Sequence, residues 1–185
     1  MPFDPDQFVS DCLAALGDGH DALAVEELIA RAVDDPTSIV RALGEPPDQP
    51  LFSTWYRSDE LTILNIIWPP QVDLLPHDHL IWASIGLYGG REDNALFREL
   101  PDGALEQRGV KRLETGDTVV LGERAIHSVV NPTQRWTGAL HVYGGDFFRD
   151  DRRTWNDGGA GCRPFDAEEV RALLMDASAR AQASN

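Results

Sequence analysis

The feature that most constrains the fold of this chain is a series of short β-type segments that begins at residue 51. The segments are rich in β-branched and aromatic residues, and Pro, Gly, Asp and Asn interrupt them at intervals of about ten residues. They cover residues 51–57, 61–68, 79–88, 95–100, 110–114, 117–121, 126–130 and 137–143. This spacing leaves no room for crossover helices, so it predicts an all-β sandwich or barrel of antiparallel strands.

The start of the chain has a helical pattern instead. Residues 1–50 carry eleven acidic and two basic residues, and their apolar residues recur at helical intervals. The two apolar stripes are Phe8, Cys12, Leu13 and Leu16, followed by Leu23, Leu28, Ile29 and Val33. We therefore predict an acidic helical extension over residues 1–50, which precedes a barrel over residues 51–148.

The last part of the chain, residues 149–185, starts with a polar, Gly-rich segment and ends with a predicted helix over residues 166–181. Asp166 stands at the N-cap of this helix, and Glu169, three residues later, is expected to complete a capping box. We expect this part to pack with the barrel as one domain.

The charge of the chain limits its partners. Thirty-one Asp and Glu against 16 Lys and Arg give a formal net charge of −15, which disfavours binding to nucleic acid or to an anionic membrane. The sequence has no apolar run of about 18 residues and no secretory signal pattern at its start, so we expect a cytoplasmic location. Cys12 and Cys162 form no CxxC pair, so we expect no disulfide framework.

Histidines mark the candidate site. His77, His79, His127 and His141 fall in the β region, whereas His20 lies in the acidic extension and is expected at the surface. If residues 77–79 lie on a strand, His77 and His79 point to the same face, with their Cα atoms about 7 Å apart. Two neutral imidazoles in this arrangement make half of a metal site. Taken alone, the pair is equally compatible with two polar surface residues of a partly exposed strand that bind nothing.

The surroundings of these histidines resemble the two motifs of the cupin superfamily, an HxH with a nearby Glu and Gly and a Gly-led hairpin that ends in His and Asn. The matching residues are His77, His79, Gly90, Gly116, His127 and Asn131. The resemblance implies a cupin double-stranded β-helix barrel, flanked by the helical extension and the C-terminal helix, with a metal ion held by the three histidines. Ala83 or Ser84 stands where cupins have the Glu ligand.

Three imidazoles with open coordination positions suit Fe²⁺ that binds a substrate and O₂ together, although Zn, Ni or Cu also accept such ligands. Among cupins, this ligand set resembles the thiol dioxygenase branch, and two further fragments resemble cysteine dioxygenase. Trp55-Tyr56-Arg57 matches an aromatic residue followed by the arginine that binds the substrate carboxylate. Leu140-His141-Val142-Tyr143 is similar to the His-x-Tyr motif that follows the last metal ligand.

The resemblance covers residues 55–148 and implies an iron(II)-dependent dioxygenase that oxidises a small thiol carboxylate, cysteine or 3-mercaptopropionate, to its sulfinate with O₂. It assigns substrate binding to Arg57 and Trp55, and it assigns catalysis to Tyr143, oriented by His141. The chain departs from the family pattern at three places, where Trp55 replaces Tyr, Ala139 replaces Ser, and Ser84 replaces the Cys that is crosslinked to Tyr in animal members.

Two other functions remain open at this point. One is a different metal-dependent cupin enzyme that acts on a small organic acid or a phenol, and the other is a metal-binding cupin without turnover. The individual residues have alternatives as well. Arg57 is also compatible with a surface pair to Asp59 or Glu60, and His141 and Tyr143 are compatible with core residues whose hydrogen bonds are satisfied.

Overall fold

The computed structural model describes residues 2–16, 22–44, 49–156, 159 and 161–183, so His20 lies outside the described residues. The helices are α1 (Pro5–Ala15), α2 (Ala22–Val33), α3 (Pro36–Leu43) and α4 (Ala167–Ala183). The strands are β1 (Leu51–Arg57), β2 (Thr62–Trp68), β3 (Asp73–Asp78), β4 (Ala83–Gly89), β5 (Arg91–Glu99), β6 (Leu105–Glu114), β7 (Thr118–Leu121), β8 (Ile126–Val130), β9 (Thr137–Tyr143), β10 (Arg153–Trp155) and β11 (Cys162–Pro164).

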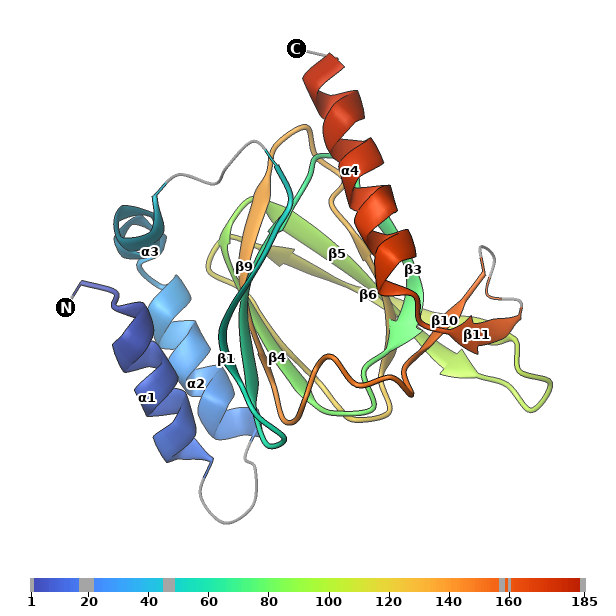
Figure 1. Ribbon diagram of the computed structural model, residues 1–185, viewed down its shortest axis with the longest axis horizontal. Helices are drawn as coiled ribbons and strands as arrows, with labels where there is room; N and C mark the ends of the chain where they lie inside the picture. The colour runs from blue at the N-terminus through green and yellow to red at the C-terminus, as the bar shows by residue number, and fades with distance from the viewer. Residues whose placement is uncertain (1, 17–21, 45–48, 157–158, 160, 184–185) are drawn as a thin grey trace.

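The strands form two antiparallel sheets that face each other (Figure 1). One sheet has five strands in the order β1-β2-β9-β4-β7, and the other has six in the order β11-β10-β3-β8-β5-β6. From β2 to β9 the chain passes repeatedly from one sheet to the other, which is the arrangement of a double-stranded β-helix. The predicted fold class, a β-helix barrel with N-terminal helices and a C-terminal helix, is therefore confirmed.

The central strands of the five-stranded sheet, β2, β9 and β4, are buried on both faces, and their side chains alternate between two apolar layers. In β2, Leu64 and Ile66 point into the core between the sheets, whereas Ile63 and Ile67 point outward. The outer layer packs against α1 and α2, which lie along this sheet in Figure 1. A strand covered on both sides is expected to be apolar throughout, and every residue of β2 is buried.

The helical stripes differ in part from the prediction. In α1, Phe8, Cys12 and Leu16 are buried as expected, but Leu13 is 39% exposed. In α2, the buried face is formed by Val25, Ile29 and Val33, and Leu23 is 63% exposed. The buried side chains of α2 follow 3.6-residue periodicity more closely than the predicted stripe does, because Val25, Ile29 and Val33 are spaced by four residues.

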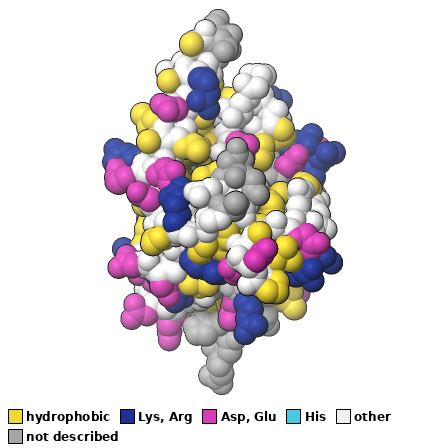
Figure 2. Space-filling view, turned by 90° about the vertical axis from the view of Figure 1, so that its right-hand side faces the viewer, with side chains coloured by type: hydrophobic (Ala, Val, Ile, Leu, Met, Phe, Trp, Pro, Cys, Tyr) yellow, Lys and Arg dark blue, Asp and Glu magenta, His cyan; other side chains and the backbone are white. Residues whose placement is uncertain are grey.

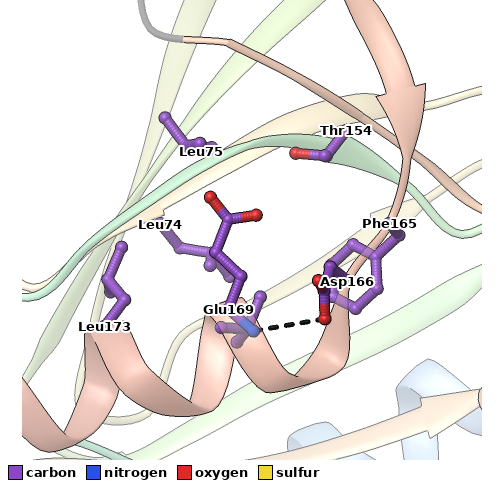
Figure 3. A pocket seen from close by; sticks show the side chains of 8 residues that line it. Leu74, Leu75, Thr154, Phe165, Asp166, Glu169 and Leu173 are labelled. Carbon is purple, nitrogen blue, oxygen red and sulfur yellow. Dashed lines mark hydrogen bonds between the residues drawn. The ribbon is translucent and has the colours of Figure 1, made fainter.

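The C-terminal helix α4 packs along the first half of β3. Leu74, Leu75 and Leu173 line a small cavity of about 20 Å³ between this helix and the barrel (Figure 3). Asp166 caps the helix as predicted, since its Oδ1 accepts hydrogen bonds from the backbone N–H groups of Glu168 and Glu169. The capping box is not completed, because the Glu169 side chain accepts a hydrogen bond from Arg163 instead.

Three strands lie outside the predicted segments. The strand β3 was not expected, and residues 79–82 of the predicted segment 79–88 precede β4. The short strands β10 and β11 fall in the segment that we expected to be polar and irregular. No helix in the described part of the chain is long and apolar enough to span a membrane.

Candidate metal centre

The three histidines of the predicted metal site converge inside the barrel. His77 lies near the end of β3, His79 follows this strand, and His127 lies opposite His77 on β8. The Nε2 atom of His79 is 3.2 Å from Nε2 of His77 and 3.4 Å from Nε2 of His127. At most 4% of each residue is exposed. The structure therefore brings together three residues that are separated by up to 50 positions in the sequence.

Residues 77–79 lie only in part on a strand, since β3 ends at Asp78, but His77 and His79 still point to the same side. Asp78 ends β3 and points away from the two histidines. Its carboxylate accepts hydrogen bonds from the backbone N–H and the Nε of Arg153, at 2.7 and 2.8 Å. This pairing keeps the negative charge of Asp78 outside the histidine cluster.

The geometry of the cluster fits a bound metal ion. A metal bound to imidazole nitrogens at about 2.1 Å, with angles of about 90° to 110° between the bonds, holds these nitrogens about 3.0 to 3.4 Å apart. The Nδ1 of His77 donates to the carbonyl of Leu75, and the Nδ1 of His127 donates to Oδ1 of Asn94. Each of these two rings therefore directs an unprotonated Nε2 at the centre of the cluster.

The protonation states of the histidines also suit metal binding. Burial lowers the pKa of His77 and His79 well below the usual value, and the charge of neighbouring His127 lowers both further. Burial, followed by the charge of Arg152, lowers the pKa of His127 to about 3. All three rings are therefore neutral at pH 7, which is the form that binds a metal. Three neutral imidazoles fit Fe²⁺, and they fit Zn²⁺, Ni²⁺ or Cu²⁺ as well.

His141 and Tyr143 form a hydrogen-bonded pair beside the cluster. Nδ1 of His141 is 3.0 Å from the hydroxyl of Tyr143, and the Tyr143 ring lies edge to face with His79 at a centroid distance of 5.1 Å. Burial raises the pKa of Tyr143 and lowers that of His141 to about 3. Both side chains are therefore neutral at pH 7, and the phenol keeps its proton.

Trp55 is not brought to the histidines. Its ring packs against Phe3 and Phe8, with centroid distances of 6.1 and 6.4 Å, in the apolar layer between α1 and the outer face of the five-stranded sheet. The histidine cluster lies on the other side of this sheet. The substrate-binding role of Trp55 stays a prediction that this position does not favour.

Arg57 lies at the surface in an ion pair with Asp146. The two hydrogen bonds of the pair measure 2.8 and 2.7 Å, and 51% of the Arg57 side chain is exposed. The partner is thus neither Asp59 nor Glu60, the two candidates from the sequence. The guanidinium also covers the ring of Phe148 at 4.7 Å. The carboxylate of Asp146 accepts hydrogen bonds from Nε and Nη2 of Arg57. The role of Arg57 in binding a substrate carboxylate therefore stays a prediction.

Arg152 is a buried cation near the histidines, and its charge contributes to the lowered pKa of His77, His79 and His127. Arg152 was not identified from the sequence. Only 4% of this residue is exposed. Its Nε and Nη1 donate to the backbone carbonyls of Asp78 and Phe147, and its guanidinium stacks on the rings of Phe147 and Phe165 at 4.3 and 4.0 Å. No described carboxylate forms an ion pair with it. Burial lowers its pKa to about 10, so it remains charged at pH 7.

Aromatic side chains enclose the site. Phe147 lies 4.3 Å from the ring of Tyr143 and 5.9 Å from that of His79, and Phe165 lies 5.8 Å from the ring of His77. Phe165 also borders the small cavity at the start of α4 (Figure 3). No histidine is visible on the face shown in Figure 2, where acidic and basic side chains are intermixed. The candidate site is therefore an interior site with an apolar wall.

Comparison with known proteins gives similarity of architecture alone. No protein-family profile matches the chain. Similar solved structures include an uncharacterized conserved protein with a double-stranded β-helix domain from Klebsiella pneumoniae, with 14% identity, 66% of this chain and 90% of that chain covered, and a TM-score of 0.44. An RmlC-like cupin family protein from Methanocaldococcus jannaschii has 10% identity, coverages of 56% and 86%, and a TM-score of 0.45.

A third similar structure is the DMSP lyase DddQ from Ruegeria pomeroyi, with 17% identity and a TM-score of 0.46. The matched region covers 61% of this chain and 54% of the lyase. These similarities assign no activity to the chain. The strand order and the three buried histidines identify it as a double-stranded β-helix protein with a three-histidine cluster that fits a metal ion.

Proposed function

We propose that the protein is an iron(II)-dependent dioxygenase that oxidises a small thiol carboxylate, cysteine or 3-mercaptopropionate, to its sulfinate. The balanced reaction is RSH + O₂ → RSO₂⁻ + H⁺, so both oxygen atoms end on sulfur. The observation that carries the proposal is a single enclosed site with three converging imidazole nitrogens, a neutral Tyr–His pair and a buried guanidinium without a carboxylate partner.

The metal would be held by His77, His79 and His127. A metal bound there would supply Lewis acidity that lowers the pKa of a coordinating thiol, together with the redox chemistry that O₂ requires. In the described part of the chain this group of potential ligands consists of the three histidines, which leave coordination positions for small molecules.

Arg152 supplies the binding site for the substrate carboxylate. A buried cation without a counter-ion destabilises the folded protein, and an anionic ligand relieves this penalty. The backbone carbonyls of Asp78 and Phe147 hold Nε and Nη1, while the two aromatic rings fix the guanidinium plane. Nη2 is the nitrogen that would donate to a carboxylate oxygen of the substrate.

Tyr143 donates a hydrogen bond to the substrate or to oxygen, and His141 fixes the position of its hydroxyl. Both residues are neutral at pH 7, so the phenol is a donor rather than an additional negative charge in the site. Phe147 and Phe165 limit the access of water, which strengthens these polar interactions.

The direct test uses purified protein loaded anaerobically with Fe²⁺. We expect 3-mercaptopropionate or cysteine to consume one O₂ for each sulfinate formed, and we expect cysteamine, which lacks the carboxylate, to react poorly. Metal binding without oxidation of any thiol would contradict the proposal and favour a binding protein or a different cupin enzyme.

The two arginines provide a matched comparison. Arg152 is buried and Arg57 is exposed. We therefore expect Arg152→Gln to lower kcat/KM for the thiol carboxylate, with a loss of transition-state stabilisation of about 2 to 4 kcal/mol. Arg57→Gln should leave kcat/KM nearly unchanged, and neither variant should alter the reaction of cysteamine. The opposite result, a loss only in the Arg57 variant, would return carboxylate binding to Arg57.

A further inference from the structure

We propose that Glu92 and Asn94 are positioning residues of the metal centre, because a hydrogen-bond chain from Glu92 through Asn94 to His127 determines which nitrogen of His127 faces the metal. The inference concerns the metal site itself and does not depend on the substrate or on the reaction. It therefore goes beyond the proposed function.

The chain of contacts is short and fully buried. Asn94 lies on β5, next to β8, where Leu96 pairs with His127. Nδ2 of Asn94 donates to Oε1 of Glu92 at 2.9 Å, and Nδ1 of His127 is 2.7 Å from Oδ1 of Asn94. Glu92 and Asn94 are 0% exposed, and His127 is 1% exposed. Water does not compete for these groups.

The direction of each hydrogen bond follows from the preceding one. The Oε1 atom of Glu92 accepts, so the Asn94 amide must turn its NH₂ group towards Glu92. The amide oxygen then faces His127, and since this oxygen can only accept, Nδ1 of His127 must carry the proton. In a neutral imidazole the lone pair is then on Nε2, the atom that lies 3.4 Å from Nε2 of His79. Glu92 thus prepares His127 for metal binding through Asn94.

Two polar neighbours face Glu92, the amide of Asn94 and the indole of Trp68, and both oppose the rise in the pKa of its carboxyl group that burial causes. Its second oxygen, Oε2, has no hydrogen-bond partner among the described residues, and none of the ion pairs of the described chain includes it. A buried carboxylate that is only partly satisfied destabilises a fold compared with an apolar side chain of similar size. The hydrogen bond to Asn94 is the interaction that links this carboxylate to the histidine cluster. Partners that orient a metal-bound histidine commonly change metal affinity 10- to 100-fold, roughly, when they are removed.

The first test measures the affinity for Co²⁺ alone, by absorbance titration, and the thermal unfolding of the metal-free protein. We expect Asn94→Leu to weaken Co²⁺ binding by about 10- to 100-fold. The matched control is Asn65→Leu, because Asn65 is also buried and accepts a hydrogen bond from Tyr88 at 2.7 Å, but on the outer face of the sheet. This control should lower the midpoint of thermal unfolding and leave the Co²⁺ affinity unchanged.

Glu92→Met separates the metal effect from stability. We expect this variant to bind Co²⁺ more weakly, although its thermal unfolding midpoint is equal to or higher than that of the wild type, because a buried carboxylate has been removed. Wild-type Co²⁺ affinity in both Asn94→Leu and Glu92→Met would overturn the proposal. So would a loss of Co²⁺ affinity in Asn65→Leu as large as that in Asn94→Leu, because the affinity would then follow stability alone.

A double variant tests the direction of the chain and guards against failure of Asn94→Leu to fold. Asn94→Asp alone places two carboxylates side by side, so we expect weaker Co²⁺ binding. Adding Glu92→Gln restores an amide that donates to the new carboxylate, which in turn accepts from Nδ1 of His127. The double variant should therefore recover most of the affinity. A double variant that binds Co²⁺ no better than Asn94→Asp would overturn the directional argument.

Discussion

At the scale of single residues, the environment of a side chain decides its role more than its type does. Arg152 and Arg153 are neighbours in the sequence, but Arg153 pairs with Asp78 and Glu99, whereas Arg152 is stacked between two phenylalanine rings. Nothing in the sequence distinguishes these two arginines, because only the fold brings their partners Asp78, Glu99, Phe147 and Phe165 together. The histidines were predictable because their spacing is itself a signal.

Tyr143 offers a test of catalysis at this scale. Tyr143→Phe keeps the packing but removes the hydroxyl that lies 3.0 Å from His141. We expect metal content to be unchanged, the free energy of unfolding to fall by about 1 to 2 kcal/mol, and turnover to fall about ten- to a thousand-fold. Metal analysis, denaturant unfolding and O₂ uptake measure these three quantities.

The control for this variant is Tyr88→Phe. Tyr88 is also buried and donates a hydrogen bond to Asn65, but it lies on the opposite face of the sheet. It should lose a similar amount of stability and retain its turnover. Equal losses of turnover in the two variants would make Tyr143 a structural residue.

At the scale of elements, the sequence predicted the strands that alternate or are apolar throughout and missed those that are interrupted by polar residues or proline. The strand β3 contains Asp73, Pro76 and Asp78. Proline lacks a backbone donor, and the register of β3 against β8 shifts between Leu74 and His77, around Pro76. Glu92 and Asn94 were missed for a related reason. The expected strand began at residue 95, since acidic residues and Asn disfavour strands.

The start of α4 provides a test at the element scale. Asp166→Ala removes the two capping hydrogen bonds to Glu168 and Glu169 and should lower the free energy of unfolding by about 1 kcal/mol. Glu169→Ala removes only a partly exposed ion pair with Arg163 and should change it by less than about 0.5 kcal/mol. Denaturant unfolding measures both values. Equal losses would indicate that the capping box forms in solution.

At the scale of the whole molecule, the buried titratable groups link stability to pH. Burial lowers the pKa of His127 and His141 to about 3, and it lowers the pKa of His77 and His79 as well. A group with a lowered pKa in the folded state stabilises the fold above its unfolded pKa of about 6.5, and this contribution is lost as the pH falls towards 3.

We therefore expect the metal-free protein to unfold in mild acid. At pH 5 each histidine that stays neutral in the folded state lowers the free energy of unfolding by about 2 kcal/mol compared with pH 7.5. Glu92 acts in the opposite direction, because burial raises its pKa to about 7. Its contribution to the free energy of unfolding declines as the pH rises from 4.5 to 7. One carboxyl group does not offset four histidines. Denaturant unfolding at pH 5 and 7.5 tests this, and equal stability at both values would contradict it.

The position of β9 also determines when the site can form during synthesis. This strand is the last of its sheet in the sequence, but it lies in the centre, between β2 and β4. A nascent chain that ends before residue 137 has no strand to join the β1–β2 hairpin to β4 and β7, although all three histidines of the cluster have already been made. The five-stranded sheet that covers the histidine cluster can therefore be completed only after β9 has been synthesised.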